Sequence, residues 1–269
     1  MTCPQRIVYF VSDRTGITAR SLGTSLLSQF PDNSFQSYQR SFINSLDKAQ
    51  QLAKELSKIA GEYGLKPLVF ATLPNKKISR VLEQAPCYYY ELFTRYLEDI
   101  SNDLGVTSTY ISGASHGVNN THSYDKRMDI VNYTLNHDDA ISMKNINKAD
   151  VILLGVSRSG KTPICLYLAL HYGVRAANYP LTADDFQTDD IPQILKQNKH
   201  KIIGLTINPK RLADIREKRR AGSQYASLVN CRNEVSRALE LFNRYRLTVF
   251  DTTSSSIEEL SARIMQKIY

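Results

Sequence analysis

The stretch VILLGVSRSGKTP, Val151 to Pro163, joins an apolar run to a turn bounded by two glycines. From Gly155 to Thr162 it fits the pattern G-x-x-x-x-G-K-[ST]. The glycines let successive N–H groups point inward at phosphate oxygens, aided by the positive end of the following helix dipole. A predicted strand before the turn and a predicted helix after it supply the setting that a phosphate-binding loop (P-loop) requires. A plain strand-to-helix turn is the alternative.

The residue types at the end of this loop indicate separate roles. Lys161 is expected to balance the charge of the terminal phosphates, and Thr162 to offer its hydroxyl to Mg²⁺. Pro163 falls in the first helical turn, where its missing N–H does no harm. The loop therefore predicts nucleotide binding, with magnesium held through the nucleotide.

Length and composition indicate an ordinary globular protein. The chain has 269 residues, of which 42% are hydrophobic, enough for one large domain or two small ones. No apolar run approaches the length of a membrane helix, and the polar start from Met1 to Arg6 lacks a signal-peptide core, so we expect a cytoplasmic protein without a membrane partner. Four scattered cysteines predict neither a disulfide framework nor a zinc site, and Cys165, in an apolar run, is expected to be a buried, inert thiol.

A net charge of +8 favours anionic partners such as nucleic acid, an anionic membrane surface or phosphorylated substrates. The densest basic stretch, Lys210 to Arg220, also contains Asp214 and Glu217 and is typical of the solvated face of a helix. A nucleic-acid-binding module is disfavoured because no such motif is present and Trp is absent, although 16 Tyr offer rings for base stacking. We therefore expect no nucleic-acid partner.

Strand-like and helix-like segments alternate along the chain, which predicts parallel sheets with helices on both faces. The expected strands are 6–13, 34–43, 66–73, 149–156, 174–181, 201–208 and 247–253, and the expected helices are 17–30, 45–64, 88–105, 123–139, 161–173, 211–220, 226–246 and a last helix opened by a capping box at Ser255 to Glu258. A polar stretch between Val106 and His122 marks a boundary or a functional loop. The predicted fold is α/β, with an N-terminal α/β domain at 1–110 and a C-terminal P-loop kinase-like domain at 111–269.

Polar residues outside the P-loop supply further candidates. Asp13 and Thr15 follow the first predicted strand, and ligands collect at the carboxyl ends of parallel strands. The alternative is that Thr15 caps the next helix and Gly16 shapes the turn.

Phosphoryl transfer to a hydroxyl needs a group that orients or deprotonates it. Such groups occur in SHGVN (115–119), HDD (137–139) and TADD (182–185). Asp184 or Asp185 in the last cluster equally suits a helix N-cap, and a lone His is more often structural.

Several longer stretches carry a family resemblance. ILLGVSRSGKTPICLYLA, RAANYPL, GLTINPKRLADIREKRR and YASLVNCRNEV, together with YFVSDRTGITA, HGVN and YTLNHDDAIS, closely resemble the bacterial phosphoenolpyruvate synthase regulatory proteins. The resemblance implies a bifunctional regulator that phosphorylates a threonine of phosphoenolpyruvate synthase with ADP and removes that phosphate with inorganic phosphate, releasing pyrophosphate. In the sister branch that regulates pyruvate, phosphate dikinase, Ser typically stands where this chain has Gly160, so the synthase is favoured as the target.

The resemblance also implies site residues. The nucleotide-binding segment would be Gly155, Val156, Ser157, Arg158, Ser159, Gly160, Lys161 and Thr162. Beside Lys161, we expect Asp184 or Asp139 to be catalytic, and Asp13, Thr15, His116 and Asn119 to contact substrate or phosphate. Pyruvate, phosphate dikinase as target and an ATP-dependent kinase of a small metabolite remain alternatives. The sequence leaves the oligomeric state open, a homodimer included.

Overall fold

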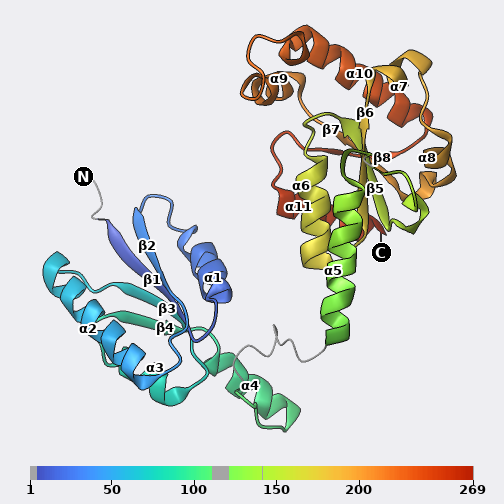
Figure 1. Ribbon diagram of the computed structural model, residues 1–269. Helices are drawn as coiled ribbons and strands as arrows, with labels where there is room; N and C mark the ends of the chain where they lie inside the picture. The colour runs from blue at the N-terminus through green and yellow to red at the C-terminus, as the bar shows by residue number, and fades with distance from the viewer. Residues whose placement is uncertain (1–4, 111–120, 141, 269) are drawn as a thin grey trace. The chain divides into compact units, whose positions relative to one another are not determined.

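The computed structural model describes residues 5–110, 121–140 and 142–268. The chain divides into two compact units, Met1–Gly117 and Val118–Tyr269, and each is built on its own four-stranded parallel sheet (Figure 1). The expected α/β class with parallel sheets flanked by helices is confirmed. The division expected between residues 110 and 111 stands seven residues before the end of the first unit.

The N-terminal unit has the strand order β2-β1-β3-β4. Its elements are β1 (Arg6–Ser12), α1 (Ile17–Leu27), β2 (Phe35–Arg40), α2 (Leu46–Tyr63), β3 (Leu68–Thr72), α3 (Lys76–Glu83), β4 (Tyr88–Glu91) and α4 (Thr94–Leu104). Alternate residues of β1 face opposite sides, as the two-residue period of a strand requires. Val8 and Phe10 pack beneath α1, whereas Tyr9 and Val11 pack against α2 and α3.

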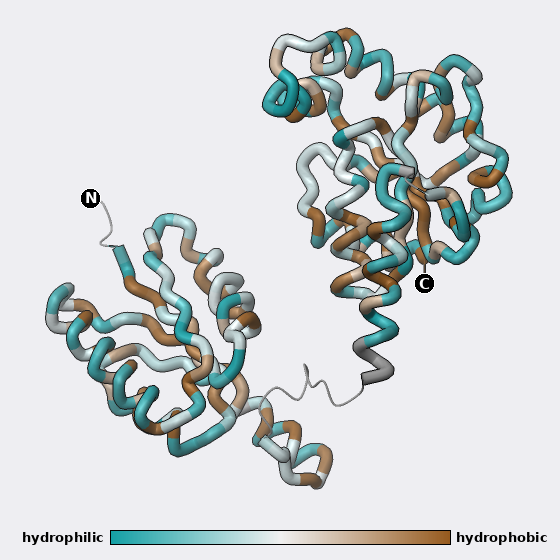
Figure 2. Tube along the Cα trace, viewed as in Figure 1, coloured by the Kyte–Doolittle hydropathy of each residue, from teal (hydrophilic) through white to brown (hydrophobic). Residues whose placement is uncertain are grey.

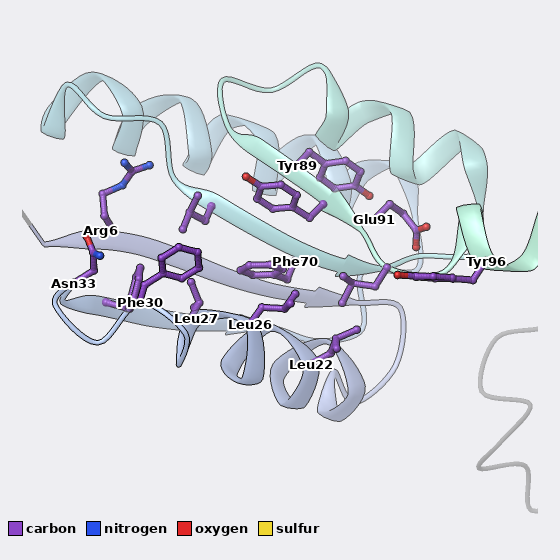
Figure 3. A pocket seen from close by; sticks show the side chains of 14 residues that line it. Arg6, Leu22, Leu26, Leu27, Phe30, Asn33, Phe70, Tyr89, Glu91 and Tyr96 are labelled. Atoms are coloured by element: carbon purple, nitrogen blue, oxygen red, sulfur yellow. The ribbon is translucent and has the colours of Figure 1, made fainter.

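Helix α1 covers only part of its face of this sheet. An apolar groove of about 710 Å³ remains, and Figure 3 shows Leu26 of α1 and Phe30 after it on one side of the groove and Phe70 of the sheet on another. The Phe70 ring stacks on Tyr90 of β4 with the centroids 5.2 Å apart. The groove therefore exposes part of the aromatic surface of the sheet.

The C-terminal unit has the strand order β6-β5-β7-β8. Its elements are α5 (Thr121–Asn136), β5 (Val151–Val156), α6 (Lys161–Tyr167), β6 (Ala176–Leu181), α7 (Ala183–Thr188), α8 (Gln193–Gln197), β7 (Ile202–Thr206), α9 (Pro209–Glu217), α10 (Leu228–Arg244), β8 (Thr248–Asp251) and α11 (Ile257–Ile268). Every residue of β5 is buried, as expected for a central parallel strand, and Figure 2 shows the apolar strands inside the polar helices. Leu154 faces α10, whereas Leu153 faces α6 and α11.

Three sequence predictions are wrong in detail. The expected helix at 88–105 begins with a strand, because aromatic residues suit a pleated edge and β4 pairs with β3 from Leu68 to Ala71. Glu91 then accepts the N–H groups of Phe93 and Thr94, which starts α4. Helix α3 went unpredicted, although the Asn75 side chain caps it.

The third error is the predicted capping box of the last helix, which is one residue out of place. The Ser256 hydroxyl accepts the N–H of Glu259 at 3.1 Å, so Ser256 rather than Ser255 is the capping side chain. Among the cysteines, Cys165 is fully buried and burial raises the pKa of its thiol, consistent with the expected inert role.

Candidate active site

The loop between β5 and α6 depends on glycine at two positions. A Cβ on Gly155 would lie 2.7 Å from the carbonyl oxygen of Leu205 and 2.8 Å from the Ser159 hydroxyl, so no larger residue fits there. Gly160 has φ +92° and begins α6, a conformation that costs other residues energy. Arg158 also has a positive φ of 72°. The sequence thus makes a tight turn that ends at the N-terminus of a helix, where backbone N–H groups favour an anion.

Lys161 lies at the centre of this turn and is almost fully buried. Its ammonium donates a hydrogen bond of 3.0 Å to the carbonyl of Val156, so the side chain folds back over the loop. Burial lowers the pKa of Lys161 to about 8, and the nearby charge of Asp139 opposes that shift most strongly. A desolvated cation held over a ring of N–H groups suits a bound phosphate chain.

Thr162 is held by a carboxylate that sequence reasoning did not select. Its hydroxyl donates a hydrogen bond of 2.7 Å to Oδ1 of Asp138, and the side-chain amide of Asn178 in β6 donates to the same oxygen. The sequence pointed instead to the neighbouring Asp139. A signal existed in the pair of adjacent carboxylates, but only the folded geometry shows which one contacts the loop.

His137 fixes this acidic segment in place. Its two ring nitrogens lie 2.7 Å from the carbonyl oxygens of Tyr133 and Lys144, and its own carbonyl accepts the N–H of Asn178. His137 is buried, so it acts as a structural anchor for the two aspartates that follow it.

Asp139 is the expected catalytic residue that lies beside the loop. Its backbone N–H donates to the side-chain oxygen of Asn178 at 3.0 Å, in a left-handed conformation with φ 46°. The carboxylate is exposed and has no hydrogen-bond partner among the described residues. Asp139 is therefore available to accept a proton near Lys161.

The two aspartates after β6 differ in their surroundings. Asp185 completes a capping box with Thr182, since its carboxylate accepts from the backbone N–H and the hydroxyl of that residue at 2.7 Å each. Tyr179 donates to its other oxygen. Asp184 is exposed in the first turn of α7, with no side-chain hydrogen bond among the described residues. Asp185 is thus structural, whereas Asp184 is free to contact a substrate.

A buried arginine supports the loop from the opposite side. Arg216 of α9 donates to the carbonyl of Ser157 at 3.0 Å and to Glu234 at 2.6 Å, and its guanidinium lies 4.0 Å from the centroid of the Tyr225 ring. The Tyr225 hydroxyl lies 2.9 Å from the Ser157 hydroxyl. The sequence placed Arg216 on a solvated helix face, which is wrong for this residue because it is fully buried.

The remaining expected residues belong to the N-terminal unit or lie outside the description. Asp13 lines a pocket of about 580 Å³ near the carboxyl ends of the strands. Thr15 does not cap α1 with its side chain, and its carbonyl accepts from Gln39 and Ser41. His116 and Asn119 lie outside the described residues.

The donor set beside the loop fits magnesium. Thr162 offers a hydroxyl oxygen, a hard ligand of the kind that Mg²⁺ prefers together with phosphate oxygens and water, and the Asp138 carboxylate orients that hydroxyl. Among the residues that the structure describes, no group of three or more His, Cys, Asp or Glu side chains could hold a metal by itself. A metal at this position would therefore depend on the nucleotide. None of the helices in the described ranges has the length and apolar character needed to cross a bilayer.

Comparisons with known proteins agree along almost the whole chain. Residues 8–265 match the model of the kinase/pyrophosphorylase family. Relatives named "Putative phosphoenolpyruvate synthase regulatory protein" occur in Thiocapsa roseopersicina (46% identical over 98% of this chain and 97% of the relative), Dichelobacter nodosus (44%, with 98% and 97% covered) and Neisseria gonorrhoeae (42%, with 99% and 97% covered).

Among solved structures, a LacI transcriptional regulator from Lactobacillus brevis matches at 7% identity, covering 91% of this chain and 98% of that one, with a TM-score of 0.21. That likeness is too low to support an argument about the fold. The family match covers the loop between β5 and α6, the two aspartates that precede β5 and the supporting arginine. The chain belongs to the kinase/pyrophosphorylase family.

Proposed function

We propose that this chain is a bifunctional regulator of phosphoenolpyruvate synthase. In one direction it transfers the β-phosphoryl group of ADP to a threonine of the synthase and inactivates it. In the other it moves that phosphoryl group to inorganic phosphate, which restores the synthase and releases pyrophosphate. Both directions are phosphoryl transfers, in keeping with the family description, and the synthase is the enzyme that the names of the relatives specify.

The observation that carries this proposal is the joint placement of Lys161 and Thr162 at the start of α6. Lys161 is buried above the turn, and Thr162 is aligned by the Asp138 carboxylate. Such a site binds a diphosphate chain through backbone N–H groups, one cation and a metal-directed hydroxyl. A plain strand-to-helix turn would not need a desolvated lysine or a carboxylate fixed on its threonine.

In the forward direction the threonine oxygen of the target attacks the β-phosphorus of ADP in line with the leaving group. The bond between that phosphorus and the bridging oxygen breaks, and AMP leaves with the electron pair. Asp139 accepts the proton of the threonine hydroxyl, because its carboxylate is exposed next to Lys161. Asp184 is the second candidate for this base. Magnesium, when bound through Thr162, neutralises developing charge on the phosphate oxygens.

In the reverse direction an oxygen of inorganic phosphate attacks the phosphothreonine. The bond between phosphorus and the threonine oxygen breaks, the protonated Asp139 returns its proton to that oxygen, and pyrophosphate forms in the place that ADP phosphates take in the kinase reaction. Lys161 and the N–H groups of the loop would hold the attacking phosphate. One anion site thus serves both reactions.

The decisive experiment follows phosphate from ADP labelled at the β-position onto purified phosphoenolpyruvate synthase, with ATP and with pyruvate, phosphate dikinase in parallel. We expect label on a threonine from ADP, removed again as pyrophosphate when inorganic phosphate is added. The Lys161→Ala variant should transfer none while remaining folded by circular dichroism. Transfer from ATP alone to a small molecule, or label on the dikinase alone, would contradict the proposal.

A further inference from the structure

A second cavity opens on the flank of the P-loop that faces β6. It has a volume of about 490 Å³ and is bounded by Ser157 of the loop, by the end of β6 with the start of α7, and by α10. Its floor is apolar, formed by Leu181 and Phe186, while its rim includes the amides of Gln187 and Asn233. A volume of this size lies within the usual range for ligand sites.

The sheet topology assigns the nucleotide to the other flank of the loop. In the order β6-β5-β7-β8, the chain runs from β5 to its neighbour β6 on one side. It then crosses to β7 on the other side of β5. Ligands of open parallel sheets bind in the crevice where the direction reverses, which here lies between β5 and β7. The cavity along the end of β6 is therefore left for the second reactant.

The candidate base lies beside the same strand, on the α6 face of the sheet, whereas the cavity opens on the α10 face at the end of β6. The segment Asp138–Ala140 packs against β6, and Asn178 of that strand accepts the N–H of Asp139. Across the end of β6, Leu181 and Thr182 line the cavity. A hydroxyl presented from the cavity over the end of β6 would thus approach both the loop and Asp139.

The polar groups of the cavity suit a peptide backbone better than a phosphate chain. Glu234 is already paired with Arg216, and Arg237 donates to the carbonyl of Phe186. The side-chain amides of Gln187 and Asn233 are exposed and have no hydrogen-bond partner among the described residues. An amide offers both a donor and an acceptor, which matches the alternating C=O and N–H groups of an extended polypeptide.

We propose that this cavity is the acceptor site, and that it binds an extended polypeptide segment of the target so that its threonine reaches over Ser157 toward the bound phosphate. The inference rests on the proposed function, because it names the place where the protein substrate of that reaction docks. The principal alternative occupant is the adenine ring of the nucleotide, which the topology assigns to the β7 side.

The test compares the double variant Gln187→Ala/Asn233→Ala with the wild-type chain. Both side chains are exposed, so folding should be unaffected. We expect the KM for phosphoenolpyruvate synthase to rise by about tenfold, as for the loss of two amide hydrogen bonds, with the Kd for ADP unchanged. The matched control is Asn243→Ala, an exposed amide of the same helix that does not line the cavity.

Each outcome decides one point. A parallel rise in the Kd for ADP, measured by titration calorimetry, would overturn the inference by placing the nucleoside in the cavity. An unchanged KM for the synthase would also overturn the inference, because it would show that the cavity does not bind the protein substrate. If the wild-type chain moved no phosphate from ADP to the synthase, the proposed function itself would fail, and the acceptor site would fall with it.

Discussion

The hydroxyl of Thr162 and the carboxylate of Asp138 are joined by a hydrogen bond of 2.7 Å, although 24 positions separate the two residues. The bond links the start of α6 to the turn after α5, before the strand that carries the loop. It fixes the orientation of the Thr162 hydroxyl in the first turn of α6. We infer that Asp138 positions the Thr162 hydroxyl for a metal that the nucleotide would bring.

Replacing Asp138 with Asn should weaken the magnesium dependence of ADP binding. The change keeps the shape of the side chain but removes the charge that orients Thr162. Because partners behind a metal ligand contribute substantially, we expect the Kd for magnesium in the presence of ADP to rise by about tenfold to a hundredfold. Calorimetric titration of ADP with and without magnesium measures this change. An unchanged magnesium dependence would contradict the role of Asp138 in orienting Thr162.

Replacing Asp139 with Asn should affect transfer rather than binding. The exposed carboxylate would no longer accept the threonine proton, so we expect the rate of transfer from ADP to fall by about 10²-fold to 10⁴-fold with the Kd for ADP retained. The comparison variant is Asp184→Asn, which removes the other candidate base. If that variant lost transfer and Asp139→Asn kept it, the base would be Asp184.

The buried lysine makes stability depend on pH. Burial lowers the pKa of Lys161 from 10.5 to about 8 in the folded state, so the unfolded chain binds more protons between these two values. The free energy of unfolding should therefore rise with pH across this window, while below pH 8 the cost of the buried charge is fully present. Lys161→Met should remove a cost on the order of 3 kcal/mol at pH 7.

Urea unfolding of both proteins at pH 7 and pH 9.5, followed by circular dichroism, measures this difference. We expect the advantage of the Met variant to shrink as the pH rises. An advantage that stayed constant, or grew, would show that Lys161 is not held as a desolvated ammonium. The same variant should bind ADP poorly, which separates the stabilising effect of the change from its functional cost.

Two helical glycines of the N-terminal unit should respond to alanine in opposite ways. A Cβ at Gly23 in α1 would lie 2.5 Å from the Phe10 ring and 3.0 Å from Phe70, so the helix must move away from the sheet. Gly61 in α2 has nothing within 4 Å of an added Cβ. We expect Gly61→Ala to stabilise by about 0.5 to 1 kcal/mol through helix propensity, and Gly23→Ala to destabilise by about 1 to 3 kcal/mol. Stabilisation by both would mean that the packing of α1 on Phe10 is loose.

The strand, turn and helix formed by β5, the loop after it and α6 were predictable because their signal is local. The spacing of Gly155, Gly160 and Lys161 and the apolar strand before them lie within a dozen residues. The tyrosine-rich strand β4 was not predictable in this way. Aromatic residues at 88–90 suit a helix or a strand, and only pairing with β3 decides between them. Local pattern predicts an element well when it needs no distant partner.

The failure to single out Asp138 from the sequence has a similar origin. Two adjacent carboxylates are equivalent in sequence, and only the structure shows that Asp138 accepts from Thr162 whereas Asp139 is exposed. Arg216 was misplaced because a basic helix predicts a solvated face. In the structure its guanidinium donates to the carbonyls of Tyr225 and Ser157 and to the Glu234 carboxylate, and these bonds offset the cost of burying the charge. Such long-range pairing leaves no local trace.

The Arg216–Glu234 pair gives the final prediction, because it joins stability to loop geometry. Arg216 is fully buried, so removing its carboxylate partner leaves an uncompensated charge in the interior. We expect Glu234→Ala to destabilise by about 3 kcal/mol or more. Arg216→Met should cost less, because Glu234 is partly exposed and can regain water.

The double variant Arg216→Met/Glu234→Ala separates the ion pair from the support of the loop. It should recover much of the stability lost in Glu234→Ala, since no buried charge remains unpaired. It should not recover ADP affinity, because the hydrogen bond from Arg216 to the carbonyl of Ser157 is still missing. Urea unfolding and calorimetric ADP titration on the three variants measure both quantities. Full affinity in the double variant would show that the loop holds its shape without Arg216.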